Sequence, residues 1–408
     1  MEKLIGKINP KETVHIIGAG ASGLILAHYL KKKNIPIKIY EKSRVGGLIS
    51  TEKRARGIIE SAANALFTND DVVDLLKDLK LEYISGNEKI KRVLVRKSKF
   101  LSFPFYFWEI PGILFNFFLK KPPYQKGLSL KQFFQPLLGE KLCDEVASTG
   151  LLGIYATDSS VLDQETFFPY YPYSSYREAF KKFTMERKKS REIYKLKKSI
   201  SFIGGMQDFI NALKNELQSD IVLQEMSTIP SNAIICTNAP AASELLEKTL
   251  PQVAKLLKQI KYQSIYTETT FTDEVFVPLK QTFGVLFSRK TPLHCYGLLA
   301  NHEIFAGRTN QGYSYTFIKK AQTNNQLNET EIKKDREFLK FPKVVENKQT
   351  TWDIGIPIYS FQRRETIEQI KDYFEKEKIE NLAIFGNYVG GISLREIISL
   401  ARQFSETL

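Results

Sequence analysis

The sequence has 408 residues, more than a single hydrophobic core normally holds, so we expect two or three domains. Its 43% hydrophobic and 25% charged residues are typical of a folded globular protein and exclude a disordered chain. Three scattered cysteines argue against a disulfide framework or a cysteine-based metal site. No apolar run of about 18 residues and no signal-peptide pattern occurs, so neither a membrane span nor secretion is predicted.

The first predicted elements are a buried strand, Val14 to Ile17, and an apolar helix, Leu24 to Leu30, joined by a glycine turn. In such a turn Gly18 permits the sharp bend, Gly20 lets the backbone approach a ligand, and Gly23 lets the helix pack on the strand. The N–H groups at the start of the helix then face an anion. This stretch predicts a diphosphate site.

A second predicted strand ends at Glu41, 18 residues after Gly23, where a carboxylate of this fold accepts hydrogen bonds from ribose hydroxyls. Gly46 and Gly47 follow and offer bare backbone a second time. Nicotinamide enzymes rarely need this second turn. The combination is typical of the FAD site of glutathione-reductase-like flavoproteins, so the predicted cofactor is FAD.

The block 89–200 is basic and aromatic and adds to a net charge of +14. Such a block is either a solvated face or a surface for an anionic partner. Its segment 101–121 is rich in phenylalanine and ends in Lys120 and Lys121, which suits lipid headgroups better than nucleic acid. We therefore expect peripheral membrane contact and no nucleic acid, with burial in a core or substrate cavity as the alternative.

The second half returns to the nucleotide-binding plan. Strand, glycine turn and helix recur from Ser201 to Leu217, a buried strand lies in 232–240, and a glycine-rich turn precedes a helix from Leu394. Residues 241–350 alternate like strands of an antiparallel sheet. We predict an α/β (α+β) fold in which 1–88, 201–240 and 351–408 form a Rossmann-like FAD-binding domain of the glutathione-reductase/amine-oxidase type. The inserted parts are a helical, membrane-facing block, 89–200, and a substrate-binding sheet, 241–350.

The order of motifs resembles the protoporphyrinogen oxidase family, part of the monoamine-oxidase-like FAD flavoproteins. The motifs that carry the resemblance are "GAGASGLILAHYL", "EKSRVGGLIST", "KRVLVRKSKFLSFPF", "STGLLGIYATDSSVLD", "FIGGMQDFINAL", "AIICTNAPAASELL", "GIPIYSFQRRETIEQI" and "FGNYVGGISLREII". The resemblance implies oxidation of a porphyrinogen, a tetrapyrrole, in haem synthesis, with FAD as cofactor and dioxygen as acceptor. It implies hydride transfer to the flavin, so no protein residue is assigned a catalytic role and no metal is expected.

The resemblance also implies the site residues. Arg92 and Asn64 are expected to bind substrate, Arg92 through a carboxylate of the tetrapyrrole. The residues expected to bind FAD are Gly18, Ala19, Gly20, Ala21, Ser22, Gly23, Glu41, Lys42, Gly46, Gly47, Leu48, Ala62, Ala63, Asn64, Ala65, Met226, Gly386, Asn387, Gly391, Ile392, Ser393 and Leu394.

The chain departs from the family pattern in places. Ala62 to Ala65 stand where the family has Gly-Pro, and Gln362-Arg363 replaces its Gly-His. Three hypotheses stay open: a porphyrinogen oxidase on the cytoplasmic face of a membrane, a related amine oxidase or desaturase, and a flavoprotein without turnover. Protoporphyrinogen IX and coproporphyrinogen III are not distinguished as substrates, and a homodimer is left open.

Overall fold

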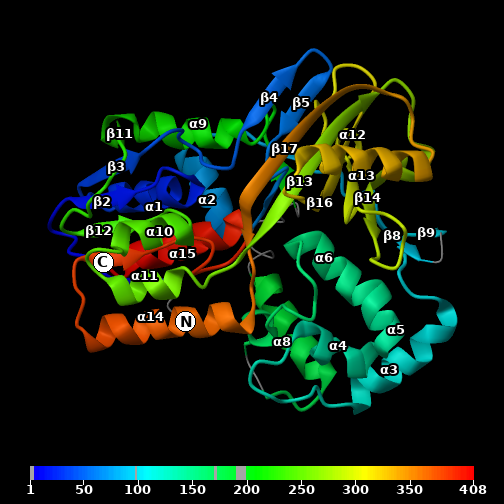
Figure 1. Ribbon diagram of the computed structural model, residues 1–408, viewed down its shortest axis with the longest axis horizontal. Coiled ribbons are helices and arrows are strands. Elements are labelled where there is room, and N and C mark those ends of the chain that lie inside the picture. Colours follow the sequence, from blue (N-terminus) through cyan, green and yellow to red (C-terminus); the bar gives the residue numbers. More distant parts are fainter. Residues whose placement is uncertain (1–3, 97–98, 170–171, 190–198) are drawn as a thin grey trace.

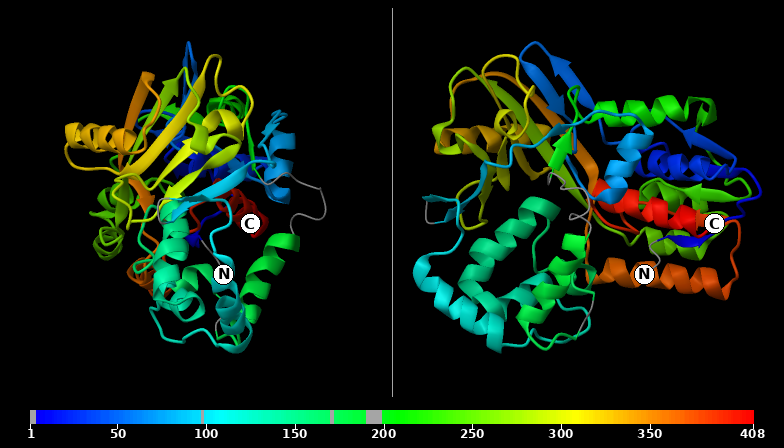
Figure 2. Two further views of the ribbon diagram at one scale, coloured as in Figure 1. Left: turned by 90° about the vertical axis from the view of Figure 1, so that its right-hand side faces the viewer. Right: turned by 180° about the vertical axis from the view of Figure 1, so that it is seen from behind.

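The computed structural model describes residues 4–96, 99–169, 172–189 and 199–408. Three parts can be followed in Figure 1: a layered unit of sheet and helices, a large second sheet, and a cluster of helices beneath the second sheet. Figure 2 shows these parts from the side and from behind. The predicted mixed α/β fold, with a Rossmann-like unit and a mainly antiparallel sheet, is confirmed.

The first sheet is the middle layer of the layered unit. Among the described residues it has six strands in the order β1-β18-β12-β2-β3-β11, and β1 alone runs antiparallel to its neighbour. The strands are β1 (Ile5–Lys7), β18 (Leu382–Ile384), β12 (Ala233–Ile235), β2 (Val14–Ile17), β3 (Ile37–Glu41) and β11 (Ile221–Leu223). Both faces are covered by helices, which is why these short strands are almost continuously apolar.

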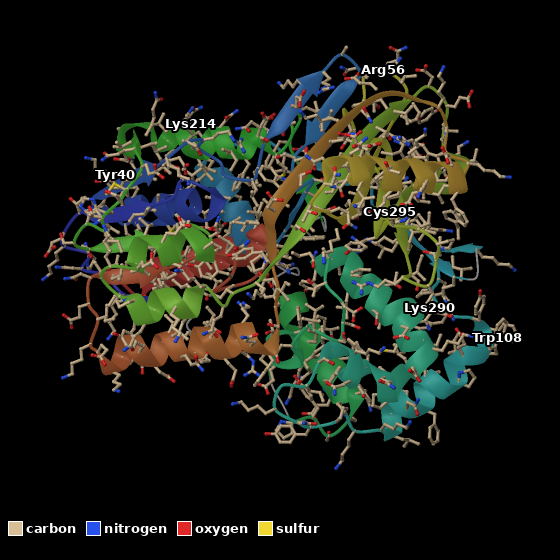
Figure 3. The ribbon with its side chains drawn as sticks, viewed as in Figure 1. Tyr40, Arg56, Trp108, Lys214, Lys290 and Cys295 are labelled. Atoms are coloured by element: carbon tan, nitrogen blue, oxygen red, sulfur yellow. The ribbon has the colours of Figure 1, made fainter. Side chains whose placement is uncertain are left out.

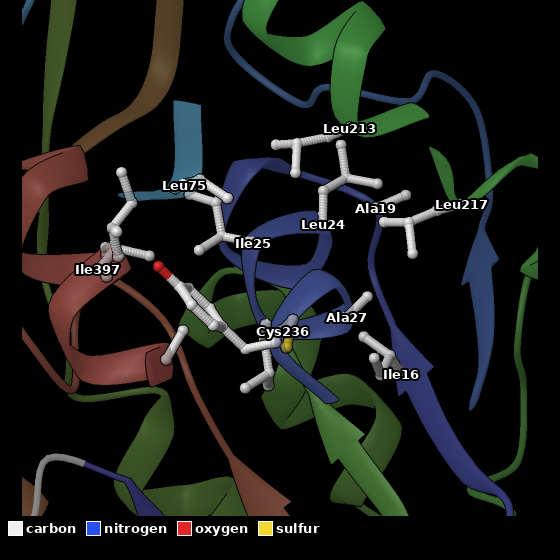
Figure 4. Close-up of a cluster of buried hydrophobic side chains, with 14 of the residues drawn as sticks. Ile16, Ala19, Leu24, Ile25, Ala27, Leu75, Leu213, Leu217, Cys236 and Ile397 are labelled. Carbon is white, nitrogen blue, oxygen red and sulfur yellow. The ribbon is translucent and has the colours of Figure 1, made fainter. Parts of the chain in front are cut away.

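Helices cover the two faces of this sheet with separate apolar cores. One face carries α1 (Ala21–Lys32), α2 (Asp70–Asp78), α9 (Gln207–Glu216) and α15 (Leu394–Glu406). The other carries α10 (Ala239–Leu246), α11 (Pro251–Leu257) and α14 (Phe361–Lys376). Figure 4 shows Leu24 and Ile25 of α1 among Leu75, Leu213 and Ile397 from the three neighbouring helices. Segments far apart in sequence therefore build one layered unit.

The second sheet brings together, within the described chain, seven strands in the order β17-β13-β16-β15-β14-β8-β9. They are β17 (Val344–Pro357), β13 (Tyr262–Thr272), β16 (Tyr313–Lys320), β15 (Gly297–Ala300), β14 (Thr282–Phe287), β8 (Lys91–Arg96) and β9 (Lys99–Leu101). All neighbours are antiparallel except β14 and β8. The back of this sheet packs against α13 (Asn325–Phe338), and α12 (Asn301–Ile304) and the turn Val277–Leu279 lie beside it.

The helical cluster has a core of its own around Phe133 and Tyr176. It contains the turn Phe107–Glu109, α3 (Ile110–Leu119), α4 (Leu130–Leu138), α5 (Glu140–Leu142), a π-helical turn (Cys143–Ser148), α6 (Thr149–Tyr155), α7 (Gln164–Phe167) and α8 (Tyr176–Lys189). Smaller elements join the three parts. They are the hairpin β4 (Thr51–Arg54) and β5 (Gly57–Glu60), the sheet of β6 (Leu66–Phe67), β10 (Ser199–Ser201) and β7 (Ile84–Ser85), and the turn Gln218–Asp220.

Two predicted boundaries do not follow the sheets. The block 89–200 was expected to be helical, yet its first strands, β8 and β9, form the edge of the second sheet. Likewise β17 runs past the predicted boundary at 350. Both differences have one cause: strand pairing joins segments that are distant in sequence, and no local pattern specifies the partner. Residues 97–98, 170–171 and 190–198 of the predicted block lie outside the described residues.

Candidate functional site

The two glycine turns lie face to face at the carboxyl end of β2. Gly20 forms a bridge with Gly46, and the Gly46 N–H donates to the carbonyl of Ala19 at 2.8 Å. A Cβ on Gly23 would lie 2.0 Å from the carbonyl oxygen of Gly18, so α1 sits directly on the turn. A Cβ on Gly20 would instead meet no atom closer than 4.0 Å, the Cα of Gly47. The space in front of Gly20 is therefore an open cradle between two bare backbone turns.

The start of α1 adds donors to this cradle. Its N-cap is Gly20, which has no side chain to cap the helix, and the first turn of α1, Ala21 to Gly23, carries no acid. N–H groups at such an end favour an anion. The residues at the cradle thus fit a dinucleotide diphosphate, as the first sequence motif predicts.

Glu41 ends β3 beside the same turn. Its Oε2 accepts from the Ala19 N–H at 2.9 Å and its Oε1 from the Ser43 N–H at 3.0 Å. The carboxylate is thereby fixed next to the cradle, where the predicted ribose acceptor should lie. Lys42 is exposed, with its Nζ 3.9 Å from Glu225, and Met226 is half-buried against the second core of the layered unit.

The segment Ala62 to Ala65 is held from both sides by residues that the sequence did not single out. Arg308, buried in the loop before β16, donates to the Glu60 carboxylate at 3.1 Å and to the Asn64 carbonyl at 3.3 Å. Trp352 of β17 donates its Nε1–H to the carbonyl of Ser61 at 2.8 Å. Burial raises the pKa of Glu60, which the Arg308 guanidinium partly offsets. The second sheet therefore fixes the backbone of this segment, although neither residue lies in a recognisable motif.

The C-terminal glycine turn, 386–393, lies where all three parts meet. Tyr359 donates its hydroxyl to the carbonyl of Asn387 at 2.8 Å, and its ring lies 6.1 Å from that of Tyr155 in α6. Ile392 packs against the core of the helical cluster. The predicted flavin segments at both ends of the chain thus share the layered unit, and the second of them touches the two inserted parts.

The helix that follows this turn caps its own start. Ser393 and Glu396 form a capping box, in which the Ser393 hydroxyl accepts from the Glu396 N–H at 3.2 Å. The Glu396 carboxylate in return accepts from the Ser393 N–H at 3.1 Å. The capping box therefore satisfies the N–H groups of Ser393 and Glu396 within the protein itself.

Arg92 lies on the front of the second sheet, the face opposite α13. Side chains alternate along β8, and Val93 and Val95 point into the core on the back. Arg92 is exposed at the edge, with its guanidinium 4.9 Å from the centre of the Phe283 ring. Farther along the front face, α6 packs closely against Leu286 of β14: a Cβ added to Gly153 would lie 2.4 Å from the Leu286 side chain. Arg92, on β8 of the second sheet, and Asn64, held by Arg308, therefore lie on different parts of the molecule.

Arg96, on the same strand, was missed by the sequence argument. It is buried and donates to Glu109, at the start of α3, and to Glu145, in the π-helical turn, at distances from 2.7 to 2.9 Å. Its guanidinium also lies 4.8 Å from the Tyr106 ring centre. This cluster ties the edge of the second sheet to the helical cluster.

An exposed aromatic surface covers α3 and the turn before it. No side chain of α3 is buried, and Phe107 is 78% exposed, Phe115 62% and Leu119 67%. Lys120 and Lys121 border it, and the Arg177 guanidinium lies 5.6 Å from the Phe118 ring. Figure 3 shows Trp108 of this surface at the outer rim of the helical cluster. We call Phe107 to Lys121 the aromatic surface.

The described residues contain no helix long and apolar enough to cross a membrane. Nor do they bring three histidine, cysteine or acidic side chains together in a way that could hold a metal ion. Cys143, Cys236 and Cys295 are buried free thiols.

Comparison with known proteins agrees with this geometry. Residues 16–79 match the family model of the NAD(P)-binding Rossmann-like domain. A chloroplastic protoporphyrinogen oxidase from Nicotiana tabacum is 23% identical over 452 aligned positions, covering 93% of this chain and 82% of the relative. The chain is therefore similar in sequence to porphyrinogen oxidases. A coproporphyrinogen III oxidase from Bacillus subtilis is 29% identical over 188 positions, 39% of this chain and 40% of that protein.

Solved structures show how widely the fold is shared. A protein from Exiguobacterium sp. 255-15, assigned as a protoporphyrinogen oxidase, superposes with a TM-score of 0.77 at 15% identity, covering 97% of this chain and 98% of that one. Cyclohexylamine oxidase from Brevibacterium oxydans gives a TM-score of 0.65 at 12% identity, covering 98% and 99%. Identities this low establish the fold alone. The resemblance to the porphyrinogen oxidases and to the amine-oxidase-like fold is confirmed.

Proposed function

We propose that this protein is an FAD-dependent oxidase that converts a porphyrinogen to the porphyrin, with dioxygen as electron acceptor, in haem synthesis. The observation that carries the proposal is the similarity to a protoporphyrinogen oxidase along 93% of this chain. A bound flavin would supply the chemistry in three two-electron rounds: in each it would take a hydride from the substrate and pass two electrons to dioxygen, which takes up two protons and leaves as hydrogen peroxide.

The residues present fit FAD. The cradle at Gly20 and Gly47 offers backbone N–H groups and open space for the diphosphate. The Glu41 carboxylate beside it is placed to accept hydrogen bonds from the ribose hydroxyls. Asn64 and the turn 386–393 are assigned to the flavin end, because the second sheet and the helical cluster meet the layered unit there. The protein itself would hold the flavin and position the substrate carbon next to it, and this requires no protein nucleophile.

Arg92 is proposed to orient the substrate. A tetrapyrrole carries carboxylates around an apolar macrocycle, and a guanidinium binds a carboxylate through two parallel hydrogen bonds. The exposed Arg92, braced on Phe283 at the edge of the front face, is suited to take a carboxylate at the rim of the substrate site.

We also propose that the aromatic surface binds anionic lipid. An apolar patch of this kind rimmed by basic side chains is typical of a membrane-facing site. The lipid surface is the favoured occupant because the patch combines exposed Phe107, Phe115 and Leu119 with Lys120 and Lys121 in one segment.

The deciding experiment follows porphyrin fluorescence and peroxide release in air with the purified, FAD-loaded protein. Protoporphyrinogen IX and coproporphyrinogen III are supplied separately, and the faster substrate names the activity. A protein that holds FAD but oxidises neither porphyrinogen would contradict the proposed activity, and turnover of an amine instead would favour the related amine oxidases.

A further inference from the structure

We propose that Arg363 is a positioning residue for the flavin: it gathers three carbonyls of the C-terminal glycine turn and so directs the N–H group of Gly391 toward the cofactor. The inference rests on the proposed function, since it concerns how this chain holds FAD. It assigns a role to the position at which the chain departs from the motif of the porphyrinogen oxidases.

The contacts of Arg363 all lead to one turn. The side chain, in the first turn of α14, is 6% exposed. Its Nε donates to the carbonyl of Tyr388 at 2.7 Å, and its Nη2 donates to those of Val389 and Gly390 at 3.1 and 3.3 Å. Its guanidinium lies 4.6 Å from the ring centre of Tyr359. Among the described residues no carboxylate pairs with it, so the partners of this buried cation are backbone carbonyls.

The carbonyl positions fix the direction of the amides. A peptide unit is planar and trans, so the Gly391 N–H points away from the Gly390 carbonyl, and thus away from Arg363. The preceding N–H groups, of Val389 and Gly390, both donate to the Gly386 carbonyl, at 3.1 and 2.9 Å. Within the described chain, the Gly391 N–H has no acceptor, although Gly391 is buried.

A buried N–H group without an acceptor is costly, and a ligand atom at this place would satisfy it. The flavin carries carbonyl oxygens on its pyrimidine ring, and the turn is assigned to the flavin end of the proposed site. A donor at this edge stabilises the reduced flavin, which carries more negative charge, more than it stabilises the oxidised flavin.

A second side chain acts on the same turn, and a neighbouring one does not. The Tyr359 hydroxyl bonds the carbonyl of Asn387 at 2.8 Å, so that Tyr359 and Arg363 together hold four consecutive carbonyls. Arg364, the next residue, donates instead to Asp163 at 2.8 Å and to Glu165 at 3.0 Å, in the helical cluster. Arg364 therefore provides a matched control: the same helix and the same charge, but no contact with the turn.

The test measures flavin affinity and the flavin midpoint potential in the full-length protein. In Arg363→Met, the affinity for reduced relative to oxidised flavin should fall about tenfold, which for two electrons lowers the midpoint potential by about 30 mV. Arg363→Lys should recover part of this, because an ammonium keeps the charge but lacks the planar fork. Tyr359→Phe should shift the potential in the same direction by less, and Arg364→Met should leave it unchanged.

The outcomes separate the inference from the proposed function. A wild-type protein that binds no flavin overturns the proposed function. A wild type that binds flavin, with Arg363→Met at the same potential as Arg364→Met, overturns the inference alone. If Arg363→Met does not fold, Arg363→Lys and Tyr359→Phe decide, and wild-type potentials in both overturn it.

Discussion

Gly20 offers the most direct test at the level of single residues. Its backbone, φ −69° and ψ 175°, is open to any residue, and an added Cβ would meet no protein atom closer than 4.0 Å. Gly20→Val should therefore leave the flavin-free fold intact, while its methyl groups fill the space meant for the diphosphate. We expect the variant to purify without flavin, as measured by its visible spectrum.

Gly112→Val is the matched control for this change. Gly112 lies in α3, away from the cradle, and a Cβ added there would meet no atom within 4 Å. It should keep its flavin. A Gly20→Val protein that purifies yellow and fully loaded would place the dinucleotide elsewhere.

Arg92 is the residue on which the substrate assignment depends. Arg92→Ala should leave the flavin spectrum unchanged and lower kcat/KM for a porphyrinogen by about 1.5–3 kcal/mol, if one charged hydrogen-bonded contact is lost. We expect the lower end of this range, because Arg92 is exposed and water weakens its contacts. Lys91→Ala removes a neighbouring exposed charge from the other side of the strand and should be neutral. Equal kcat/KM values in Arg92→Ala and Lys91→Ala would show that Arg92 does not bind the substrate.

At the level of elements, the aromatic surface predicts binding to anionic liposomes. Each basic residue near such a surface contributes about 1 kcal/mol, and the exposed rings add apolar burial. The double variant Phe107→Ser and Phe115→Ser should lose flotation with the liposomes while keeping the fold, since both rings are exposed. Val277→Ser with Phe338→Ser, which removes two exposed apolar side chains elsewhere, should float like the wild type. Wild-type protein that stays at the bottom of the gradient contradicts the proposal.

Arg96 joins two elements, and its loss should show as lost stability. Arg96→Met leaves the Glu109 and Glu145 carboxylates, 15% and 13% exposed, without their cation. Removing one partner of such a buried cluster costs about 3–5 kcal/mol in the free energy of unfolding, measured by denaturant titration. Arg56→Met breaks an ion pair whose Asp273 side chain is 58% exposed and should cost under about 1 kcal/mol. Similar losses in the two variants would show that the cluster around Arg96 contributes no more than a surface pair.

At the level of the whole molecule, FAD should act as a structural ligand. The residues assigned to it come from three separate segments of the layered unit, so binding favours the state in which all three are assembled. Free FAD at about a hundred times its dissociation constant should stabilise the folded state by about 2.7 kcal/mol. Thermal unfolding of the flavin-free protein, followed with and without added FAD, measures this. The shift should be absent in Gly20→Val, and a wild-type Tm independent of FAD contradicts the assignment.

The Rossmann-like unit could be predicted from the sequence alone. Its signals are local: the turn at Gly18 to Gly23 needs residues without side chains, the strands before and after it need continuous apolar residues, and Glu41 follows at a fixed interval. The strands over 262–272 and 313–320 were equally readable, because polar and apolar residues alternate along them. The exposed position of Arg92 beside Phe283 was not readable, since it depends on which strand lies next to β8.

The partners of residues outside these motifs became known only from the folded structure. Arg308 and Glu60 are separated by 248 positions, and nothing in the sequence around either residue indicates that they are in contact. The same holds for three other contacts between distant segments: the pairing of β8 with β14, the ion pairs of Arg96, and the hydrogen bonds from Arg363 to three backbone carbonyls. The physical reason is that a local pattern specifies what an element buries, whereas a buried charge finds its partner only when packing brings distant elements together.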